Sequence, residues 1–459
     1  MKKMIVIGLD CMEPSLVFEQ FRDLMPNVRR LTEAGVHGKM RSTEPPITVP
    51  AWTSMMTSKD PGQLGVYGFR NRADYSYKGL YFANDDYIHE KRVWNYLARR
   101  RVNTFALSVP QTYPPKPMRG TLVADFLTPD KNVPWTYPIE AAHEIDFLAD
   151  GDYIIDVKDF RTDNKDWLIE QIYKMTERRF KVFREFVRRG EHEFCMMVEM
   201  GVDRMHHAFW RHHDVKHRLH EPNNKYQYVI RDYYKYLDAR IGELLEVVDA
   251  DTAVMIVSDH GAKGMVGAIC VNEWLMQKGY LALKEPLKGP GKLKMDNIDW
   301  SRTKAWGEGG YYSRIFFNVK GREPEGIIAP ADYPAFRDRI QKDFEEIADE
   351  NGKNIGTVVL RPENIYREVK NVAPDLIVYF GNLDWRSAGQ IGTGKIHIFE
   401  NDTGPDDANH AAYGIFALRL PGGQKAQALP EYSIYDVAPT ILNYFGVEIP
   451  ADFIGKSVL

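Results

Sequence analysis

Six short apolar runs, each about as long as a β-strand, recur along the chain between longer amphipathic stretches. They cover residues 4–10, 104–109, 194–200, 253–259, 375–380 and 413–420. Several are apolar almost throughout, as strands covered on both faces must be. The stretches between them repeat apolar residues at helical spacing, and two of these stretches close on a glycine. The pattern predicts an α/β protein with a mostly parallel sheet and helices on both sides.

The alternation of strands and helices weakens in two places. Residues 110–160 are rich in proline and aromatic residues, and residues 280–350 contain "KEPLKGPGKLK" and "GREPEGIIAP". We interpret both segments as insertions on one core, because a chain of 459 residues with 44% hydrophobic content can bury a large one. The prediction is a single domain over residues 1–459 that carries two insertions.

Composition limits the cellular compartment and the binding partners that we expect. The net charge of -4 lacks the basic footprint that binding to a nucleic-acid backbone needs, so a nucleic-acid polymer is not expected as a partner. Cys11, Cys195 and Cys270 are widely spaced, which suits reduced thiols in a reducing compartment. "MKKMIVIGLD" is too short and too polar at its end for a secretion signal and predicts a first strand. We expect a cytoplasmic protein with no transmembrane segment, and a homo-oligomer stays open.

Acidic and histidine residues follow two of the apolar runs at the points where the strands should end. The run 4–10 ends in Asp10, and the run 253–259 ends in Asp259, which His260 follows directly. Open α/β sheets place their ligand sites outside the carboxyl ends of the strands. Each residue taken alone also fits a turn or a cap, so only the combination indicates a site.

A second acidic and histidine set lies further along the chain. The run 194–200 leads into "GVDRMHHAFW", where Asp203 and His207 are four residues apart and share one side of a helical turn. His410 stands just before the run 413–420. Sets of carboxylates and imidazoles suit divalent zinc or manganese, and two such sets predict a two-metal site. The lack of cysteine ligands argues against a structural zinc.

Thr48 lies two residues before Pro50 in "ITVPAWTS", where a helix is expected to begin. A threonine there is commonly an N-cap. Alternatively it is a nucleophile, because a helix start offers free N–H groups to an anion such as phosphate. A divalent metal beside the hydroxyl lowers its pKa and lets it attack phosphorus, and the two predicted metal sets supply that activation.

On these residues the sequence resembles the alkaline phosphatase superfamily, and within it the type I phosphodiesterase and nucleotide pyrophosphatase branch with its phosphohydrolase and phosphomutase relatives. The similar segments follow the family order over nearly the whole chain: "VIGLDCMEP", "MPNVRRLTEAG", "PPITVPAWTSMMTSKDPGQLGVYGF", "GVDRMHHAFW", "SDHGAKGMVG", "ENDTGPDDANHAAYGIF" and "DVAPTILNYFGVEIP". The resemblance implies an alkaline-phosphatase-like three-layer α/β/α sandwich, in which the two insertions form a substrate-side cap.

The resemblance also implies how the site residues divide. It gives one metal site made of Asp203, His207 and His410, and a second made of Asp10, Asp259, His260 and the Thr48 oxygen. Two divalent ions, zinc first and manganese as the alternative, would grip a phosphoryl group that passes through a covalent phosphothreonine at Thr48. The four-residue step of the family selects His207 over its neighbour His206.

The sequence departs from the family pattern beside the nucleophile. Ser58 and Leu64 replace a common glycine and histidine, and Phe69 stands where the diesterase branch has an asparagine that contacts a phosphate oxygen. Arg70 or Asn71 is the candidate substitute.

Four further residues are candidates for contact with substrate. Tyr311, Tyr312 and Arg314 lie in the segment 306–324, which either reaches over the metals or forms a surface loop. Lys263, just after "SDHG", faces either phosphate or solvent.

The predicted function is a two-metal phosphodiesterase acting on a small-molecule or lipid-linked phosphate ester. The sulfatase pattern, Cys or Ser followed by x-Pro-x-Arg, needs an arginine at position 52, where this chain has Trp52, so a sulfatase is not expected. A serine in place of Thr48 would be typical of cofactor-independent phosphoglycerate mutases. The alternatives are a phosphomutase or phosphotransferase on the same site and, from another class, a catalytically inactive metal-dependent binding protein.

Overall fold

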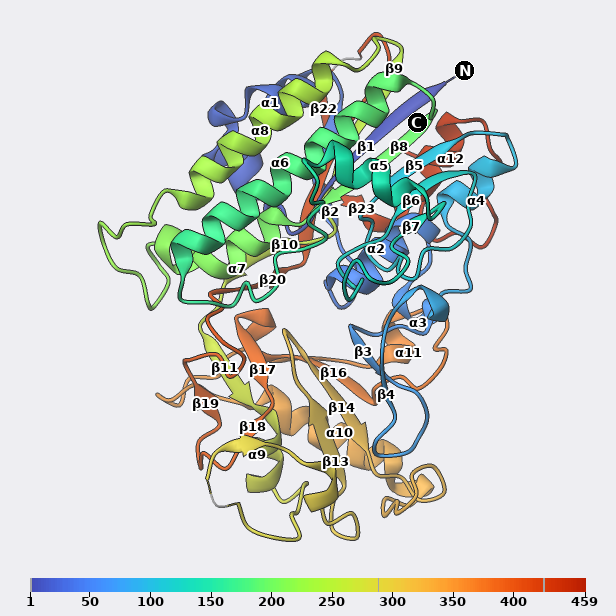
Figure 1. The fold of residues 1–459 in the computed structure, drawn as a ribbon. Helices are drawn as coiled ribbons and strands as arrows, with labels where there is room; N and C mark the ends of the chain where they lie inside the picture. Colours follow the sequence, from blue (N-terminus) through green and yellow to red (C-terminus); the bar gives the residue numbers. More distant parts are fainter. Residues whose placement is uncertain (1, 288, 424–425) are drawn as a thin grey trace.

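The computed structural model of the protein describes residues 2–287, 289–423 and 426–459, which form a larger and a smaller lobe (Figure 1). The larger lobe contains a ten-stranded sheet in the order β22-β2-β21-β9-β1-β8-β5-β6-β7, with β23 also paired to β2. Its central strands are parallel: β9 (Thr252–Val257), β1 (Lys3–Leu9), β8 (Phe194–Glu199) and β5 (Thr104–Leu107). These four predicted strands are confirmed, and their side chains are almost all buried because helices cover both faces.

The two edges of this sheet are built differently from its centre. On one side the strands are β21 (Tyr413–Arg419), β2 (Val36–Arg41), β22 (Gln427–Ala428) and β23 (Tyr432–Ser433), and β21 runs antiparallel to both β9 and β2. On the other side β6 (Gly120–Val123) continues the parallel order, and β7 (Thr136–Tyr137) is antiparallel to it. The predicted strand at 413–420 is therefore part of the main sheet but lies antiparallel to its neighbour.

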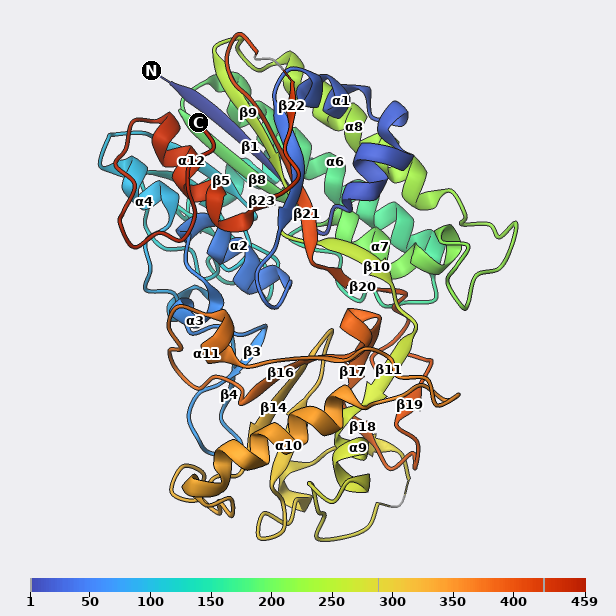
Figure 2. The ribbon, with the colours of Figure 1, turned by 180° about the vertical axis from the view of Figure 1, so that it is seen from behind.

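Two groups of helices cover the sheet. One group packs α1 (Pro26–Glu33), α6 (Lys165–Arg189), α7 (Gly201–His213) and α8 (Val229–Glu246) together, with α5 (Ala141–Leu148) against α6. The other group contains α2 (Thr48–Thr57), α3 (Pro61–Leu64), α4 (Val93–Ala98) and α12 (Val437–Tyr444), and it is seen in the view from behind (Figure 2). The arrangement is the α/β/α sandwich that the sequence predicts.

The smaller lobe is inserted between two strands that pair with each other, β10 (Gly261–Gly264) and β20 (Ala408–Ala411). Its strands are β11 (Gly267–Cys270), β12 (Gly291–Lys292), β13 (Ala305–Glu308), β14 (Ser313–Phe317), β15 (Val358–Leu360), β16 (Leu376–Tyr379), β17 (Trp385–Ala388), β18 (Gln390–Ile391) and β19 (His397–Ile398). Its helices are α9 (Val271–Gln277), α10 (Tyr333–Glu345) and α11 (Pro362–Ile365). A hairpin of β3 (Arg70–Arg72) and β4 (Leu80–Phe82) runs from the larger lobe down beside it (Figure 1).

One predicted strand lies outside the central sheet. The run 375–380 forms β16 in an antiparallel four-stranded sheet of the smaller lobe, ordered β13-β14-β16-β15. The expectation that all six runs share one sheet is wrong for this one. The smaller lobe has its own hydrophobic core. Strand β16 is therefore as fully buried as a strand of the main sheet, and its residues are just as apolar.

The two segments predicted as insertions occupy different lobes. Residues 280–350 lie in the smaller lobe, whereas residues 110–160 supply β6, β7 and α5 to the larger lobe. The three cysteines are buried and free. Across the part of the chain that the structure describes, no helix has both the length and the apolar content needed to cross a membrane.

Candidate active site

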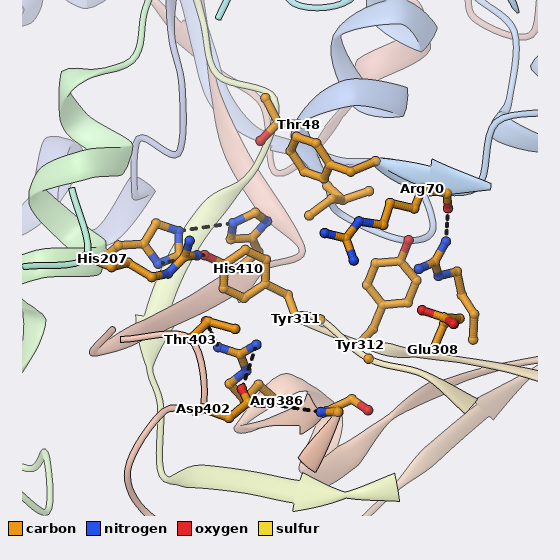
Figure 3. Close-up of a pocket in the computed structure, with 18 of the residues that line it drawn as sticks. Thr48, Arg70, His207, Glu308, Tyr311, Tyr312, Arg386, Asp402, Thr403 and His410 are labelled. Atoms are coloured by element: carbon orange, nitrogen blue, oxygen red, sulfur yellow. Dashed lines mark hydrogen bonds and ion pairs between the residues drawn. The ribbon is translucent and has the colours of Figure 1, made fainter. Parts of the chain in front are cut away.

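A cavity of about 710 Å³ lies between the two lobes (Figure 3). Thr48, His207 and His410 of the larger lobe line one wall, and Tyr311 and Arg314 of the smaller lobe line another. The carboxyl ends of the parallel strands point toward this space, which is where an open α/β sheet places its site. The sequence prediction of a site at the strand ends therefore coincides with this cavity.

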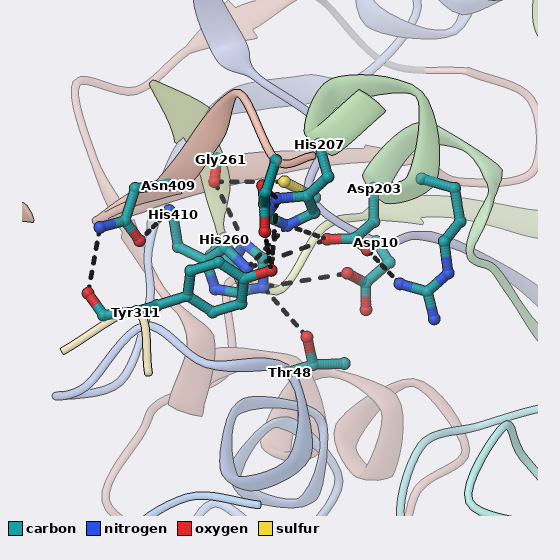
Figure 4. Close-up of polar contacts among 12 residues, drawn as sticks. Asp10, Thr48, Asp203, His207, His260, Gly261, Tyr311, Asn409 and His410 are labelled. Atoms are coloured by element: carbon teal, nitrogen blue, oxygen red, sulfur yellow. Dashed lines mark hydrogen bonds and ion pairs between the residues drawn. The ribbon is translucent and has the colours of Figure 1, made fainter. Parts of the chain in front are cut away.

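The first group of predicted ligands comes together at the start of α7. Asp203 Oδ1 lies 3.2 Å from Nε2 of His207, one helical turn later, and 3.9 Å from Nε2 of His410 on β20. The two imidazole Nε2 atoms are 3.3 Å apart (Figure 4). All three side chains are buried, and their donor atoms face a common point that is able to hold one cation.

The second group lies at the ends of β1 and β9, which are parallel neighbours. His260 Nε2 lies 3.1 Å from Asp259 Oδ2 and 3.8 Å from Asp10 Oδ1. The same nitrogen is 3.3 Å from Oγ1 of Thr48 (Figure 4). The structure thus gathers Asp10, Asp259 and His260 around one point, with the Thr48 hydroxyl beside His260.

Thr48 is the first residue of α2, and its neighbour Ile47 occupies the N-cap position without a side-chain cap. The Thr48 hydroxyl is therefore not used as the cap of this helix. The side chain is 3% exposed and turns toward His260. The helix start also brings the Thr48 and Val49 N–H groups, which have no partner within the helix, close to the same place.

Backbone carbonyls orient two of the histidines. Nδ1 of His260 donates to the Gly261 carbonyl at 3.1 Å, and Nδ1 of His410 donates to the Pro46 carbonyl at 2.9 Å. A carbonyl only accepts, so the proton is on Nδ1 and the lone pair on Nε2 faces the cluster. This is the tautomer that a metal ligand needs.

Asp406 performs the same task for His207, and the sequence prediction did not include it. Its Oδ1 lies 2.7 Å from His207 Nδ1, while its Oδ2 accepts from Arg161 Nε at 3.0 Å and from the Tyr311 hydroxyl at 3.1 Å. Burial opposes charge on His207, but Asp406 and Asp203 outweigh it and raise the pKa of His207 to about 9. The sequence offered one signal for Asp406: it stands four residues before the predicted ligand His410, in "GPDDANH".

Arg204 is a second residue that the sequence prediction missed. Its Nη1 donates to Asp203 Oδ2 at 2.5 Å, and the rest of the guanidinium forms a two-bond pair with Asp156. Burial disfavours the charged form of Asp203, but His207 and Arg204 hold the pKa of this carboxyl well below its usual range. The carboxylate is thus kept ionised and fixed in direction.

The hydrogen bonding of Asp10 and Asp259 shows whether the second group is suited to a metal ion. Asp10 Oδ2 accepts from Trp52 Nε1 at 2.7 Å, and Asp259 Oδ1 accepts from the Cys11 N–H at 3.2 Å. Within the described residues, Asp10 Oδ1 and Asp259 Oδ2 have no hydrogen-bond partner, and burial raises the pKa of both carboxyl groups well above the usual range. Unsatisfied buried carboxylates are costly, and a divalent cation between them satisfies both, so the residues fit the predicted metal.

His206 shows why the choice between adjacent histidines matters. Its Nε2 lies 3.0 Å from the Tyr234 hydroxyl on α8, away from the cluster, and burial lowers its pKa to about 3. His207, one residue later, is rotated by about 100° around the helix and faces Asp203. The four-residue spacing therefore picks the side chain that joins the group.

The predicted substrate residues divide into those in the cavity and those outside it. Tyr311, Tyr312, Arg314 and Arg70 line the cavity, and the Arg70 side chain extends into it from β3 (Figure 3). Asn71 is instead buried beneath the hairpin, where its side chain accepts from the Tyr67 N–H at 2.7 Å and donates to the Gly68 carbonyl at 2.9 Å.

Lys263 is also engaged outside the cavity wall. Its Nζ forms an ion pair with Asp384 at 2.5 Å and donates to the Asn382 carbonyl at 3.1 Å. Arg386, which the sequence prediction did not single out, does line the cavity and is 6% exposed.

A parallel-centred α/β sheet whose strand ends gather two carboxylate and imidazole groups is an alkaline-phosphatase-like fold. The family model of type I phosphodiesterase / nucleotide pyrophosphatase matches residues 4–406. The chain belongs to this family, a member of the alkaline phosphatase superfamily, and the resemblance seen in the sequence is confirmed. His410 lies just beyond the matched residues. No curated protein matches the chain.

Proposed function

We propose that the protein is a two-metal phosphodiesterase that transfers a phosphoryl group from a small-molecule ester to Thr48 and then to water. The observation that carries the proposal is the position of Thr48 Oγ1, 3.3 Å from His260 Nε2 and at the start of a helix that faces the cavity. Membership of a phosphodiesterase family supports the reaction class.

Asp203, His207 and His410 would hold one ion. Asp10, Asp259, His260 and the Thr48 oxygen would hold the other. When bound, two divalent cations, zinc first and manganese as the alternative, lower the pKa of the hydroxyl and offset charge on the attacking and departing oxygens. The Nε2 lone pairs and the unpartnered carboxylate oxygens are the donors that such ions require.

The chain's own groups then carry out two displacements at phosphorus. Oγ1 of Thr48 attacks the phosphorus atom of the diester, the bond to one alcohol breaks, and that alcohol leaves with the hydroxyl proton. A phosphothreonine forms that still carries the second ester group. Water breaks the new Oγ1–P bond and restores the threonine. The N–H groups at the start of α2 and the positive end of its dipole stabilise the equatorial oxygens in both steps.

Arg70 is our candidate for the phosphate-oxygen contact that an asparagine makes elsewhere in the family. It extends into the cavity, whereas the Asn71 side chain is used by the backbone of its own loop. Tyr311, Tyr312 and Arg314, which line the cavity, are our candidates for contact with the leaving group. The ring of Tyr311 stacks on His410 with centroids 4.4 Å apart, so this residue also covers the first cluster.

The test compares Thr48→Ala with Thr48→Ser on an aryl phosphodiester, using protein loaded with zinc or manganese. Thr48→Ala should lose turnover by at least about 10³-fold with its metal content intact, while Thr48→Ser keeps a measurable rate because it keeps the hydroxyl. Full activity of Thr48→Ala would refute the nucleophile. Transfer to an added alcohol in preference to water would instead identify a phosphotransferase or phosphomutase, and metal binding with no turnover of any ester would identify an inactive binding protein.

A further inference from the structure

The hairpin β3–β4 presents large apolar side chains at the edge of the cavity. Leu80 and Phe82 are two residues apart on β4, so they point to the same side of the strand. Leu80 is 41% exposed and Phe82 is 61% exposed, yet both line the cavity that contains Thr48. They therefore form its rim, where their apolar surface faces both water and the interior.

A segment of the smaller lobe faces this hairpin across the rim. Leu293 and Met295 are half-buried and line the same cavity. The hairpin turn is joined to this segment by the ion pair of Lys78 Nζ with Asp296 Oδ1 at 2.5 Å. The two pairs of apolar side chains thus lie on neighbouring elements that line the same cavity.

The hairpin is also anchored on the smaller lobe from behind. The Tyr77 ring stacks on Trp300 with centroids 3.6 Å apart, and Arg72 forms a buried ion pair with Glu323 at 3.2 Å. These two contacts fix the hairpin to the smaller lobe. Phe82 is therefore exposed on an ordered strand and not on a loose loop.

Aromatic side chains continue from the rim toward the nucleophile. Phe69 and Phe126 line the cavity with ring centroids 6.0 Å apart, and Phe69 takes the place of the family asparagine. The Arg70 guanidinium lies 5.1 Å from the centre of the Phe82 ring. A cationic group therefore stands at the inner end of the apolar rim.

We infer that the site takes amphiphilic phosphate esters, in which the phosphate lies at Thr48 and Arg70 and an alkyl or acyl chain leaves the cavity between Phe82 and Met295. This inference rests on the proposed function and names its substrate class. Of the four rim side chains, Leu80, Leu293 and Met295 offer neither an aromatic ring on which a nucleobase could stack nor a hydrogen-bonding group that reads its edge. The rim therefore favours an apolar chain over a nucleoside.

Calorimetric titration of the metal-loaded protein with butyl- and octylphosphonate, each below its micelle concentration, measures this directly without turnover. The Kd should fall at least about tenfold from butyl to octyl, which is well under the limit of about fourfold per buried CH₂ group. Phe82→Ser and Leu80→Ser should each reduce that ratio to about threefold or less. Phe147→Ser, on α5 and outside the cavity, removes an 80% exposed phenylalanine and should keep the ratio.

The outcomes separate the inference from the proposed function. Equal affinity for the two phosphonates, or a ratio in Phe82→Ser and Leu80→Ser as large as in Phe147→Ser, would overturn the inference even if aryl phosphodiesters are hydrolysed. Chain-length dependence that the rim variants lose would support it, even if no ester is turned over and the proposed function fails. Sedimentation with phosphatidylglycerol vesicles then assigns the source, because the protein pellets if the chain belongs to a membrane lipid and stays in solution if it belongs to a free amphiphile.

Discussion

The two candidate metal clusters use the same types of side chain but differ in how their charge is balanced. In the first cluster, Arg204 pairs with Asp203 at 2.5 Å, and Asp406 fixes His207 and is itself paired with Arg161. Each carboxylate of this cluster therefore has a cationic neighbour. The protein organises this cluster before any ion arrives.

The second cluster lacks such support among the described residues. Asp10 and Asp259 are fully buried, each leaves one oxygen without a hydrogen-bond partner, and the nearest donors are the Trp52 indole and the Cys11 N–H. Its carboxylates depend on a cation for their compensation. An ion at the first cluster would therefore enter a preorganised site. An ion at the second cluster would also stabilise the protein, because it would compensate the buried carboxylates.

Loss of one carboxylate from either cluster should have the largest effect. We expect Asp10→Asn and Asp203→Asn each to lower kcat/KM on an aryl phosphodiester by about 10³-fold or more, since each removes part of several kcal/mol of charge stabilisation. Elemental analysis should show that each variant loses about one metal equivalent. Retention of both ions at full activity would show that the clusters are not the metal sites.

In the metal-free protein, substitutions in the two clusters should change the free energy of unfolding in opposite directions. In chelator, at a pH above the raised pKa of Asp10, the Asp10→Asn variant should have a free energy of unfolding about 1–3 kcal/mol larger than that of the wild type, because it removes an uncompensated buried charge. The Asp203→Asn variant should have a free energy of unfolding about 3 kcal/mol smaller, because it removes one of the two carboxylates that balance the buried charge of Arg204. Shifts of the same sign in both variants would contradict the difference in charge balance.

Asp406→Asn should weaken only the first cluster. The neutral amide orients His207 less well, so metal affinity at that cluster should fall about 10- to 100-fold, as for other partners of metal-bound histidines. Competition with a chromogenic chelator measures it. Asp407→Asn is the matched control, because the Asp407 carboxylate faces Arg211 at 3.6 Å instead of a cluster histidine, and an equal loss in the control would exclude a specific role for Asp406.

The smallest effect should come from His206→Gln. It removes the contact with Tyr234 and should cost about 1 kcal/mol of stability, with metal content and kcat/KM unchanged within about twofold. Urea unfolding and elemental analysis of the same preparation test both points. Loss of a metal ion in this variant would mean that the helix presents the other histidine to the cluster.

The sequence determined the larger part of the site because its ligands follow strand ends and a helical turn. Parallel strands bring residues that follow them to one edge, so Asp10, Asp259 and His260 meet without knowledge of the loops. The spacing of Asp203 and His207 is likewise a property of one helix. These rules are local, and they predicted the central strands and the ligands at the strand ends and on the helix. The division of the ligands into two sites, with Thr48 at the second, came from the resemblance to the family.

Tertiary structure alone decided which side chains support these ligands and what surrounds them. Asp406 reaches His207 from 199 residues later in the chain and is itself paired with Arg161. Arg204 is next to Asp203 in the sequence, but Asp156 from another segment holds its guanidinium in place. The hairpin carrying Phe82 sits beside a segment more than 200 residues later. Strand β16 has the sequence of a central strand yet belongs to the smaller lobe. Burial gives a strand its apolar pattern whichever core it enters, and no local rule specifies which distant charge will stand beside a buried one.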